Sequence, residues 1–177
     1  MEYFFVLLSA LISSIISYKA GKYVPLPYYP STERRGFCTS CIDMRFVNTE
    51  NEAFESEFGV NGFDIFVAPG PSLALASNST GLYAPAFSAA WHRGLEISQA
   101  VNSTTVVVIA DHEDCGYYAS APYVSASSYS AGNYEQRKAI QFRQMSVTLN
   151  YLAASYTDTE FEGMWIGLDG SVEYVPF

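Results

Sequence analysis

Two short segments of this sequence hold the residue types from which a metal site can be built. The first spans residues 41–45 (CIDMR), and the second spans residues 112–116 (HEDCG). The thiolates of Cys41 and Cys115 and the imidazole of His112 are a ligand set that suits zinc and leaves a fourth position open for water. Zinc lowers the pKa of its bound water towards about 7, which supplies a hydroxide nucleophile at neutral pH. The sequence therefore predicts a zinc site formed by these three side chains.

Each segment by itself permits a simpler interpretation. A single cysteine near the end of a strand is commonly a small buried apolar residue. Cys38 and Cys41 also have the spacing of a redox pair or of half a zinc knuckle. If residues 38–41 are extended, the two thiols point to opposite faces of the strand, which disfavours one ion being bound by both. Asp43 and Arg45 alone fit a surface ion pair of little energetic value.

Both segments follow runs that are typical of strands. The β-branched run at residues 104–110 (TTVVVIA) predicts a strand covered on both faces, and residues 36–42 lead directly into Asp43. Further strands are expected at residues 63–67 and as a pair within 163–175, and helices at 51–58, 86–101 and 134–156. This alternation predicts an α/β fold with a mainly parallel sheet flanked by helices. Since the carboxyl ends of parallel strands share one edge, the two segments should meet there.

Two finer expectations concern the covering elements. In the helix at residues 86–101, the side chains of Phe87, Trp91, Leu95 and Val101 are expected to share a buried face. His92 in the same helix is expected to be a partly exposed helix residue rather than a proton shuttle. The stretch at residues 120–132 is rich in small and polar residues, and we expect a surface loop there.

The N-terminus differs from the rest of the chain. Residues 3–18 carry no charge and would form a hydrophobic helix of about 24 Å, a marginal span of a bilayer whose hydrocarbon core is about 30 Å thick. We expect a membrane anchor at residues 1–19, a proline-rich tether at 20–36 and a zinc domain at 37–177. Basic residues directly after the apolar run favour a domain on the cytoplasmic side. A cleaved signal peptide, with a secreted or luminal domain, and a buried core helix are the alternatives.

Composition narrows the classes of function. The chain has 177 residues, of which 49% are hydrophobic and 15% charged, so an intrinsically disordered chain is excluded. Its net charge of −9 argues against nucleic-acid binding, which requires basic residues. Residues 1–35 hold four basic and two acidic side chains, whereas residues 36–177 hold five and sixteen. The predicted zinc domain is therefore strongly acidic, and three cysteines are too few for a disulfide framework.

Together the two segments resemble the motifs of a known family. CIDMR resembles the Cys-x-Asp-x-Arg motif of the β-class carbonic anhydrases, and HEDCG resembles their His-x-x-Cys-Gly motif. The order of the expected strands and helices between residues 37 and 175 is also similar. The resemblance implies that Cys41, His112 and Cys115 bind Zn²⁺ and that Asp43 and Arg45 form a catalytic dyad. It further implies reversible hydration of carbon dioxide to bicarbonate by at least a homodimer.

The dyad implied by the resemblance leaves two arrangements open. A carboxylate beside zinc can bind the ion and close the fourth position, or it can accept a hydrogen bond from the nucleophile and orient it. Arg45 would favour the second arrangement by drawing Asp43 away from the metal through a charge-assisted pair.

The sequence also departs from the family pattern. Residues 67–70 (VAPG) stand where the family commonly has an Arg-Asn-Ala-Gly-like stretch. Glu113 and Asp114 add negative charge that would raise the pKa of zinc-bound water unless the two acids face solvent. Two alternatives to carbonic anhydrase activity follow. One is hydrolysis of a related small molecule such as carbonyl sulfide, and the other is a catalytically weak or inactive domain with a structural or assembly role.

Overall fold

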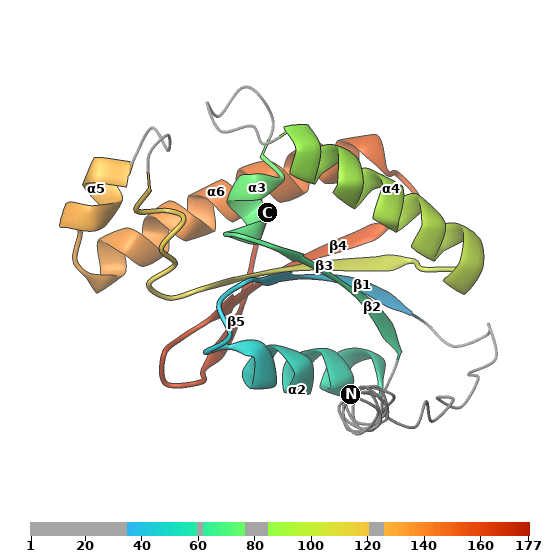
Figure 1. Cartoon of the computed structure of the whole chain (residues 1–177), viewed down its shortest axis with the longest axis horizontal. Coiled ribbons are helices and arrows are strands. Elements are labelled where there is room, and N and C mark those ends of the chain that lie inside the picture. Colours follow the sequence, from blue (N-terminus) through green and yellow to red (C-terminus); the bar gives the residue numbers. More distant parts are fainter. Residues whose placement is uncertain (1–34, 60–61, 77–84, 121–125) are drawn as a thin grey trace, which may run out of the picture. The chain divides into compact units, whose positions relative to one another are not determined.

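The computed structural model describes residues 35–59, 62–76, 85–120 and 126–177. The strands are β1 (Gly36–Cys41), β2 (Phe63–Ala68), β3 (Val106–His112), β4 (Glu160–Ile166) and β5 (Val172–Val175). The helices are α2 (Val47–Phe58), α3 (Pro71–Ala74), α4 (Pro85–Asn102), α5 (Ala126–Ala131) and α6 (Tyr134–Ser155). Strands and helices alternate through most of this order, as the sequence predicts (Figure 1).

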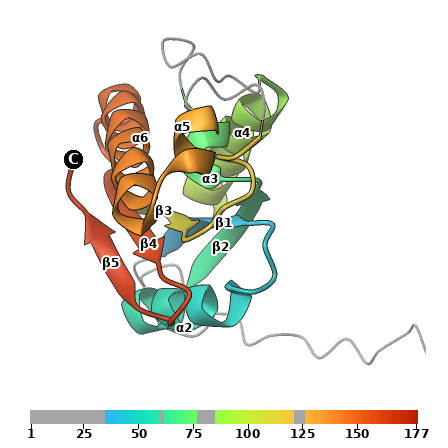
Figure 2. The same ribbon diagram turned by 90° about the vertical axis from the view of Figure 1, so that its left-hand side faces the viewer.

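The strands form one sheet in the order β2-β1-β3-β4-β5. The first four strands are parallel, and β5 returns antiparallel to β4. The predicted α/β fold with a mainly parallel sheet is confirmed, as is the strand pair within residues 163–175. Viewed from the end where β1 and β3 finish, the sheet lies between α2 on one side and the other helices on the opposite side (Figure 2).

The central strand β3 is buried at every position, because helices cover both faces of the sheet. Val107 and Ile109 pack in one apolar cluster with Trp91 of α4. Val108 alternates with them and packs in a second cluster with Phe54 of α2. This arrangement explains why the strand is apolar throughout rather than alternating between apolar and polar residues.

Helix α6 packs closely against β4 because residue 163 is glycine. A Cβ atom at Gly163 would lie 2.6 Å from Met145 Sδ and 2.8 Å from Leu149 Cδ1. The helix begins at a capping box, in which Asn133 Oδ1 accepts from Gln136 N and Gln136 Oε1 accepts from Asn133 N, each at 3.0 Å. The long amphipathic helix predicted from the sequence is thereby fixed along the sheet.

Three expectations about the covering elements need correction. Helix α2 begins at Val47 rather than at residue 51, and α5 lies inside the expected surface loop at 120–132. In α4, Trp91 is buried, but Val101 is 69% exposed. Six residues separate Val101 from the buried Leu95, which rotates Val101 about 240° around the helix and away from the sheet. Phe87, in the first turn of α4, is also exposed.

The expected membrane anchor at residues 1–19 and most of the tether at 20–36 lie outside the described residues. Among the helices that are described, none combines the length and the apolar character needed to cross a bilayer. The anchor therefore stays a prediction from the sequence.

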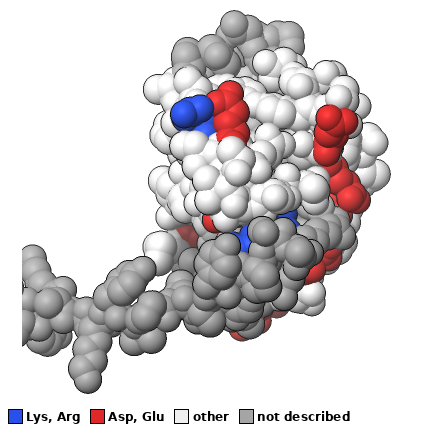
Figure 3. Space-filling model, turned by 90° about the vertical axis from the view of Figure 1, so that its right-hand side faces the viewer, with Lys and Arg blue, Asp and Glu red and all other residues white. Residues whose placement is uncertain are grey.

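Acidic side chains cover more of the face shown in Figure 3 than basic ones do. Four basic residues of the domain are engaged in ion pairs with acidic neighbours. The pairs are Arg45–Asp43, Arg93–Glu96, Arg137–Asp114 and Lys138–Glu173. The positive charges of these four residues are therefore compensated by neighbouring carboxylates.

Helix α2 carries a buried carboxyl group beneath the end of β1. Glu50 is 1% exposed, and its Oε2 accepts a hydrogen bond from the Ser40 hydroxyl. Burial raises the pKa of Glu50 to about 7, against the opposing effect of the Ser40 hydrogen bond. The Glu50 carboxyl group therefore stays protonated in the folded protein at pH values at which it is ionised in the unfolded chain.

We expect this group to make stability depend on pH. Between about pH 4.5 and pH 7 the unfolded chain is ionised at Glu50 while the folded protein is not, so stability falls as the pH rises. The free energy of unfolding should decrease by about 3 kcal/mol more over this range in wild type than in Glu50→Gln. Urea unfolding of both full-length proteins at a series of pH values measures the difference. Parallel curves for the two proteins would contradict this assignment.

Candidate metal centre

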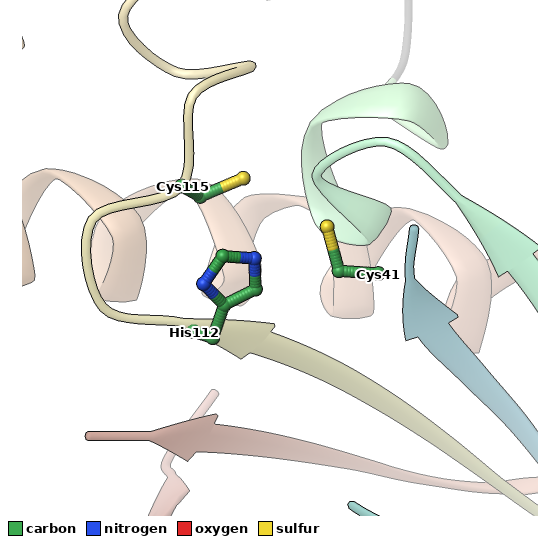
Figure 4. Close-up of side chains that lie close together, drawn as sticks. All are labelled: Cys41, His112 and Cys115. Atoms are coloured by element: carbon green, nitrogen blue, oxygen red, sulfur yellow. The ribbon is translucent and has the colours of Figure 1, made fainter. Parts of the chain in front are cut away.

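The structure brings Cys41, His112 and Cys115 together at one edge of the sheet (Figure 4). Cys41 ends β1 and His112 ends β3, so the pairing of these two strands places both side chains at the same edge. The potential ligand atoms of the three residues all lie within 4.8 Å of one another. The exposed fractions of the residues are 8%, 0% and 2%, respectively. A buried group of two thiols and one imidazole at this spacing has the composition of a zinc site.

A tight turn returns Cys115 to the end of the strand. Asp114 has a φ of 59°, in the left-handed region that Asp and Asn enter more readily than most residues. Its carboxylate accepts a hydrogen bond from Arg137 Nη1 of α6 at 2.8 Å. Arg137 therefore stabilises the turn at Asp114, and the Cys115 thiol lies beside Cys41 and His112.

Local contacts orient the imidazole of His112. Its Nδ1 donates to the backbone carbonyl of Glu113 at 2.8 Å, which leaves Nε2 as the atom that carries a free electron pair. The ring stacks on Phe46, with 4.1 Å between ring centroids. Nε2 is buried and has no hydrogen-bond partner among the described residues. A metal ion bound by the two cysteines would satisfy this atom, so the residues present fit zinc.

The two thiols form an electrostatically coupled pair. A hydrogen bond between them lowers the pKa of Cys41 and raises the pKa of Cys115. The backbone of Gly70 also stabilises the Cys41 thiolate by a hydrogen bond. One thiolate is thus favoured before any metal binds, and a divalent cation would take the place of the remaining proton.

Gly70 occupies a position that only glycine fits well. Its φ is 52°, and a Cβ there would lie 3.0 Å from Tyr117 Cδ1 and 3.5 Å from Cys115 Sγ. This glycine therefore lets the backbone approach the cysteine pair closely. Residues 67–70, which depart from the family pattern, in this way still contribute to the site.

Asp43 and Arg45 form a bidentate ion pair at the rim of the cysteine and histidine cluster. Arg45 Nη2 lies 2.6 Å from Asp43 Oδ2, and Arg45 Nε lies 3.0 Å from Oδ1. The guanidinium lowers the pKa of Asp43 to about 2, so the carboxylate is ionised at neutral pH. Asp43 Oδ2 is 4.0 Å from His112 Nε2. This ion pair is the contact on which the second arrangement considered from the sequence depends.

An open cleft of about 560 Å³ leads to the cluster. Cys41, Asp43, His112 and Cys115 line it, and its remaining lining residues are Ile42, Met44, Pro69, Gly116, Tyr117 and Ser120. The rim is largely apolar, with Ile42 59% and Met44 75% exposed. Such a cleft can admit a small neutral molecule to the fourth position of a metal ion.

The neighbouring acids are compensated rather than directed at the cluster. Glu113 Oε2 accepts from the backbone N–H of Leu168 at 2.9 Å, and Asp114 is paired with Arg137. Asp111 is completely buried and accepts hydrogen bonds from Ser72 and from the Tyr118 hydroxyl. Burial raises the pKa of Asp111, which favours its neutral form. Glu113 and Asp114 are thus bound to groups outside the cluster, which reduces their expected effect on a metal-bound nucleophile.

Two residues singled out in the sequence lie elsewhere. Cys38 packs with Phe54 in the cluster on the α2 side, and burial raises the pKa of its thiol. It is thus on the opposite face from Cys41, as expected for an extended strand. His92 lies on α4, half-buried, and its Nδ1 is 2.5 Å from the Tyr156 hydroxyl oxygen. The expectation that His92 is a helix residue rather than part of the site is consistent with this contact.

Sequence reasoning missed several residues that shape the site. Phe46 stacks on His112, and Gln141 of α6 donates to the His112 carbonyl oxygen at 2.8 Å. Neither residue lies in a motif, and neither contact follows from spacing along the chain. Gly70, by contrast, could be recognised as a turn residue from the sequence, because it stands between two prolines.

Comparison with family models finds one match that covers most of the chain. Residues 31–176 match the family model described as "Putative carbonic anhydrase". A search of curated proteins found no match to this chain.

Solved structures of β-carbonic anhydrases share the fold. A tetrameric β-carbonic anhydrase of Sordaria macrospora has a TM-score of 0.53 at 14% identity, with 100% of this chain and 98% of that chain covered. The β-carbonic anhydrase isoform I of Trichomonas vaginalis has a TM-score of 0.53 at 16% identity, with 97% and 96% covered. The β-carbonic anhydrase CafD of Aspergillus fumigatus has 0.54 at 12%, with 89% and 95% covered. The match to the family model spans most of the chain, and the chain therefore belongs to the carbonic anhydrase family, with the fold of the β-carbonic anhydrases.

Proposed function

We propose that this chain is a zinc enzyme that reversibly hydrates carbon dioxide to bicarbonate. The observation that carries the proposal is the buried cluster of Cys41, His112 and Cys115 at the base of a cleft, beside a carboxylate that is paired with Arg45. A purely structural zinc site has four protein ligands and no open position. Within the described residues this cluster offers three. Three ligands and an access route are the arrangement of a catalytic zinc site.

The three side chains would hold zinc through two sulfur atoms and His112 Nε2. Bound there, zinc would supply a nucleophile at neutral pH by lowering the pKa of a water ligand towards about 7. The hydrogen bond from His112 Nδ1 to the Glu113 carbonyl keeps Nε2 directed at the ion.

Asp43 and Arg45 would have separate roles at the fourth coordination position of the metal. Ionised Asp43 can accept a hydrogen bond from the nucleophile and orient it towards the substrate. Arg45 holds Asp43 in place through its bidentate contact and so prevents the carboxylate from occupying the metal itself. The apolar residues Ile42, Met44 and Pro69 suit carbon dioxide, which is small, uncharged and without a permanent dipole.

We further propose that the working unit is a homodimer or a larger assembly. Strand β2 is an edge strand, and Ile65 and Val67 on it are 47% and 50% exposed. An exposed apolar edge strand is a site at which a second chain can pair. The exposed Ile42 and Met44 lie in the segment that follows β1, the neighbour of β2. The tetrameric β-carbonic anhydrase of Sordaria macrospora supports assembly of a related fold.

Metal content and turnover test the central proposal. We expect the full-length protein to bind about one zinc per chain and to catalyse carbon dioxide hydration in a stopped-flow assay. Cys41→Ser should lose the metal and fall to the background rate, because the cluster then lacks one thiolate. Cys38→Ala is the matched control, since Cys38 packs on the opposite face of β1, and it should keep both properties.

The outcomes separate the alternatives. Less than about half an equivalent of zinc in wild type would contradict the proposal. Stoichiometric zinc without turnover of carbon dioxide would favour a structural domain, and turnover of carbonyl sulfide alone would favour the related hydrolase.

Replacing the arginine of the dyad tests the role assigned to Asp43. In Arg45→Ala the carboxylate loses its partner and is free to approach the metal, so we expect kcat/KM to fall about 10–100-fold with zinc content unchanged. Arg45→Lys should recover only part of this loss, because an ammonium group cannot make the two parallel contacts. Stopped-flow kinetics measure both effects. A wild-type rate in Arg45→Ala would show that Asp43 needs no restraint.

The assembly is tested at the edge strand. Val67→Lys should convert the assembly to a monomer, because it places a charge on the exposed edge of β2. Val147→Lys on α6 is the control, since Val147 is also exposed, at 39%, but lies on a helix far along the chain from β2. Size-exclusion chromatography with light scattering gives the mass of each. A monomeric wild type, or an unchanged assembly in Val67→Lys, would contradict the proposed interface.

A further inference from the structure

Gln141 of α6 is a fully buried amide that uses both of its ends. Its exposed fraction is 0%, and its Nε2 donates to the carbonyl oxygen of His112 at 2.8 Å. Its Oε1 accepts from Trp165 Nε1, also at 2.8 Å. A buried amide costs free energy unless it is hydrogen-bonded, and a contact at each end therefore points to a specific role.

The contact at His112 fixes one particular peptide group. The carbonyl of His112 and the N–H of Glu113 belong to the same peptide plane. Gln141 Nε2 binds the carbonyl, and the N–H donates to the Ile166 carbonyl of β4 at 2.8 Å. The plane is thus held from a helix on one side and from a strand on the other.

The orientation of the imidazole depends on this peptide group. His112 Nδ1 donates to the next carbonyl oxygen, that of Glu113, at 2.8 Å. If the peptide between these residues rotates, the acceptor of Nδ1 moves and the direction of Nε2 changes with it. A buried metal ligand needs such outer contacts to stay aligned.

Trp165 determines which way round the amide lies. The indole N–H can only donate, so it must face the oxygen of Gln141, and the amide nitrogen is then left for His112. Trp165 is completely buried, and Lys138 Nζ lies 4.7 Å from its ring centroid. Lys138 is in turn paired with Glu173 of β5 at 2.5 Å. The orientation of Gln141 is therefore set by a rigid neighbour.

We propose that Gln141 is a positioning residue for the metal ligand His112, acting through the His112–Glu113 peptide. This inference rests on the proposed function, because it assumes that His112 binds zinc. It adds a residue from α6 to a site whose ligands come from β1, β3 and the turn after β3.

Gln141→Met tests the inference, since methionine is similar in length and cannot donate to His112. We expect the zinc dissociation constant of the full-length protein, measured by competition with a chelator, to increase about 10–100-fold. Gln144→Met is the matched control. Gln144 is also buried on α6, but its Nε2 bonds to Thr148 Oγ1 at 3.2 Å, so zinc affinity should stay within about twofold of wild type.

A spectroscopic readout separates positioning from a loss of stability. Cobalt-loaded Gln141→Met should show visible absorption bands that differ from those of cobalt-loaded wild type, because the imidazole is misaligned. Cobalt-loaded Gln144→Met should show the wild-type bands even if its melting temperature is lower. If Gln141→Met does not fold, Trp165→Phe removes the indole donor to Gln141 Oε1, along with part of the ring that Lys138 contacts, and should weaken zinc binding in the same direction.

Each outcome decides the matter. Zinc affinity and cobalt bands of wild-type character in Gln141→Met would overturn the inference while leaving the proposed function intact. Equal weakening in Gln141→Met and Gln144→Met would also overturn it, because the effect would then be one of general stability. Failure of the wild-type protein to bind zinc would contradict the proposed function itself, and this inference with it.

Discussion

Parallel pairing of β1 with β3 is the constraint on which the candidate metal centre depends. The two strands are aligned from Gly36 with Val106 to Thr39 with Ile109, and they end at Cys41 and His112. Because both strands run the same way, their last residues reach the same edge of the sheet although they are 71 positions apart in the sequence. Coverage of both faces makes this pairing stable, and β3 is buried along its whole length.

The polar groups beside the cluster show how a strongly acidic domain accommodates a site built on two thiols. Three carboxylates near the site each have a specific partner. Arg45 binds Asp43, Arg137 binds Asp114, and the backbone N–H of Leu168 binds Glu113. The buried carboxyl groups are stabilised in their neutral form, since burial raises the pKa of both Glu50 and Asp111. The cluster is therefore surrounded by compensated charge and by apolar side chains, which leaves Nε2 of His112 as its unsatisfied atom among the described residues.

Much of this arrangement could be predicted from the sequence, and the remainder depends on contacts that spacing does not encode. The β-branched run before His112 predicts a buried strand, and two motifs at strand ends predict a shared site. The prediction that Val101 is buried was wrong, because a residue six positions after the buried Leu95 does not lie on the same side of a helix. Helix α5 was missed because its small, polar residues are typical of loops. Phe46 and Gln141 reach His112 from other elements, so only the folded chain shows their roles.

The central claim is that Cys41, His112 and Cys115 bind one zinc ion and leave its fourth position open. X-ray absorption at the zinc edge of the full-length protein tests this claim most directly. The account predicts two sulfur neighbours at about 2.3 Å, one histidine nitrogen at about 2.0–2.1 Å and one further light atom from water. A first shell with a third sulfur atom, or with no sulfur at all, would contradict it.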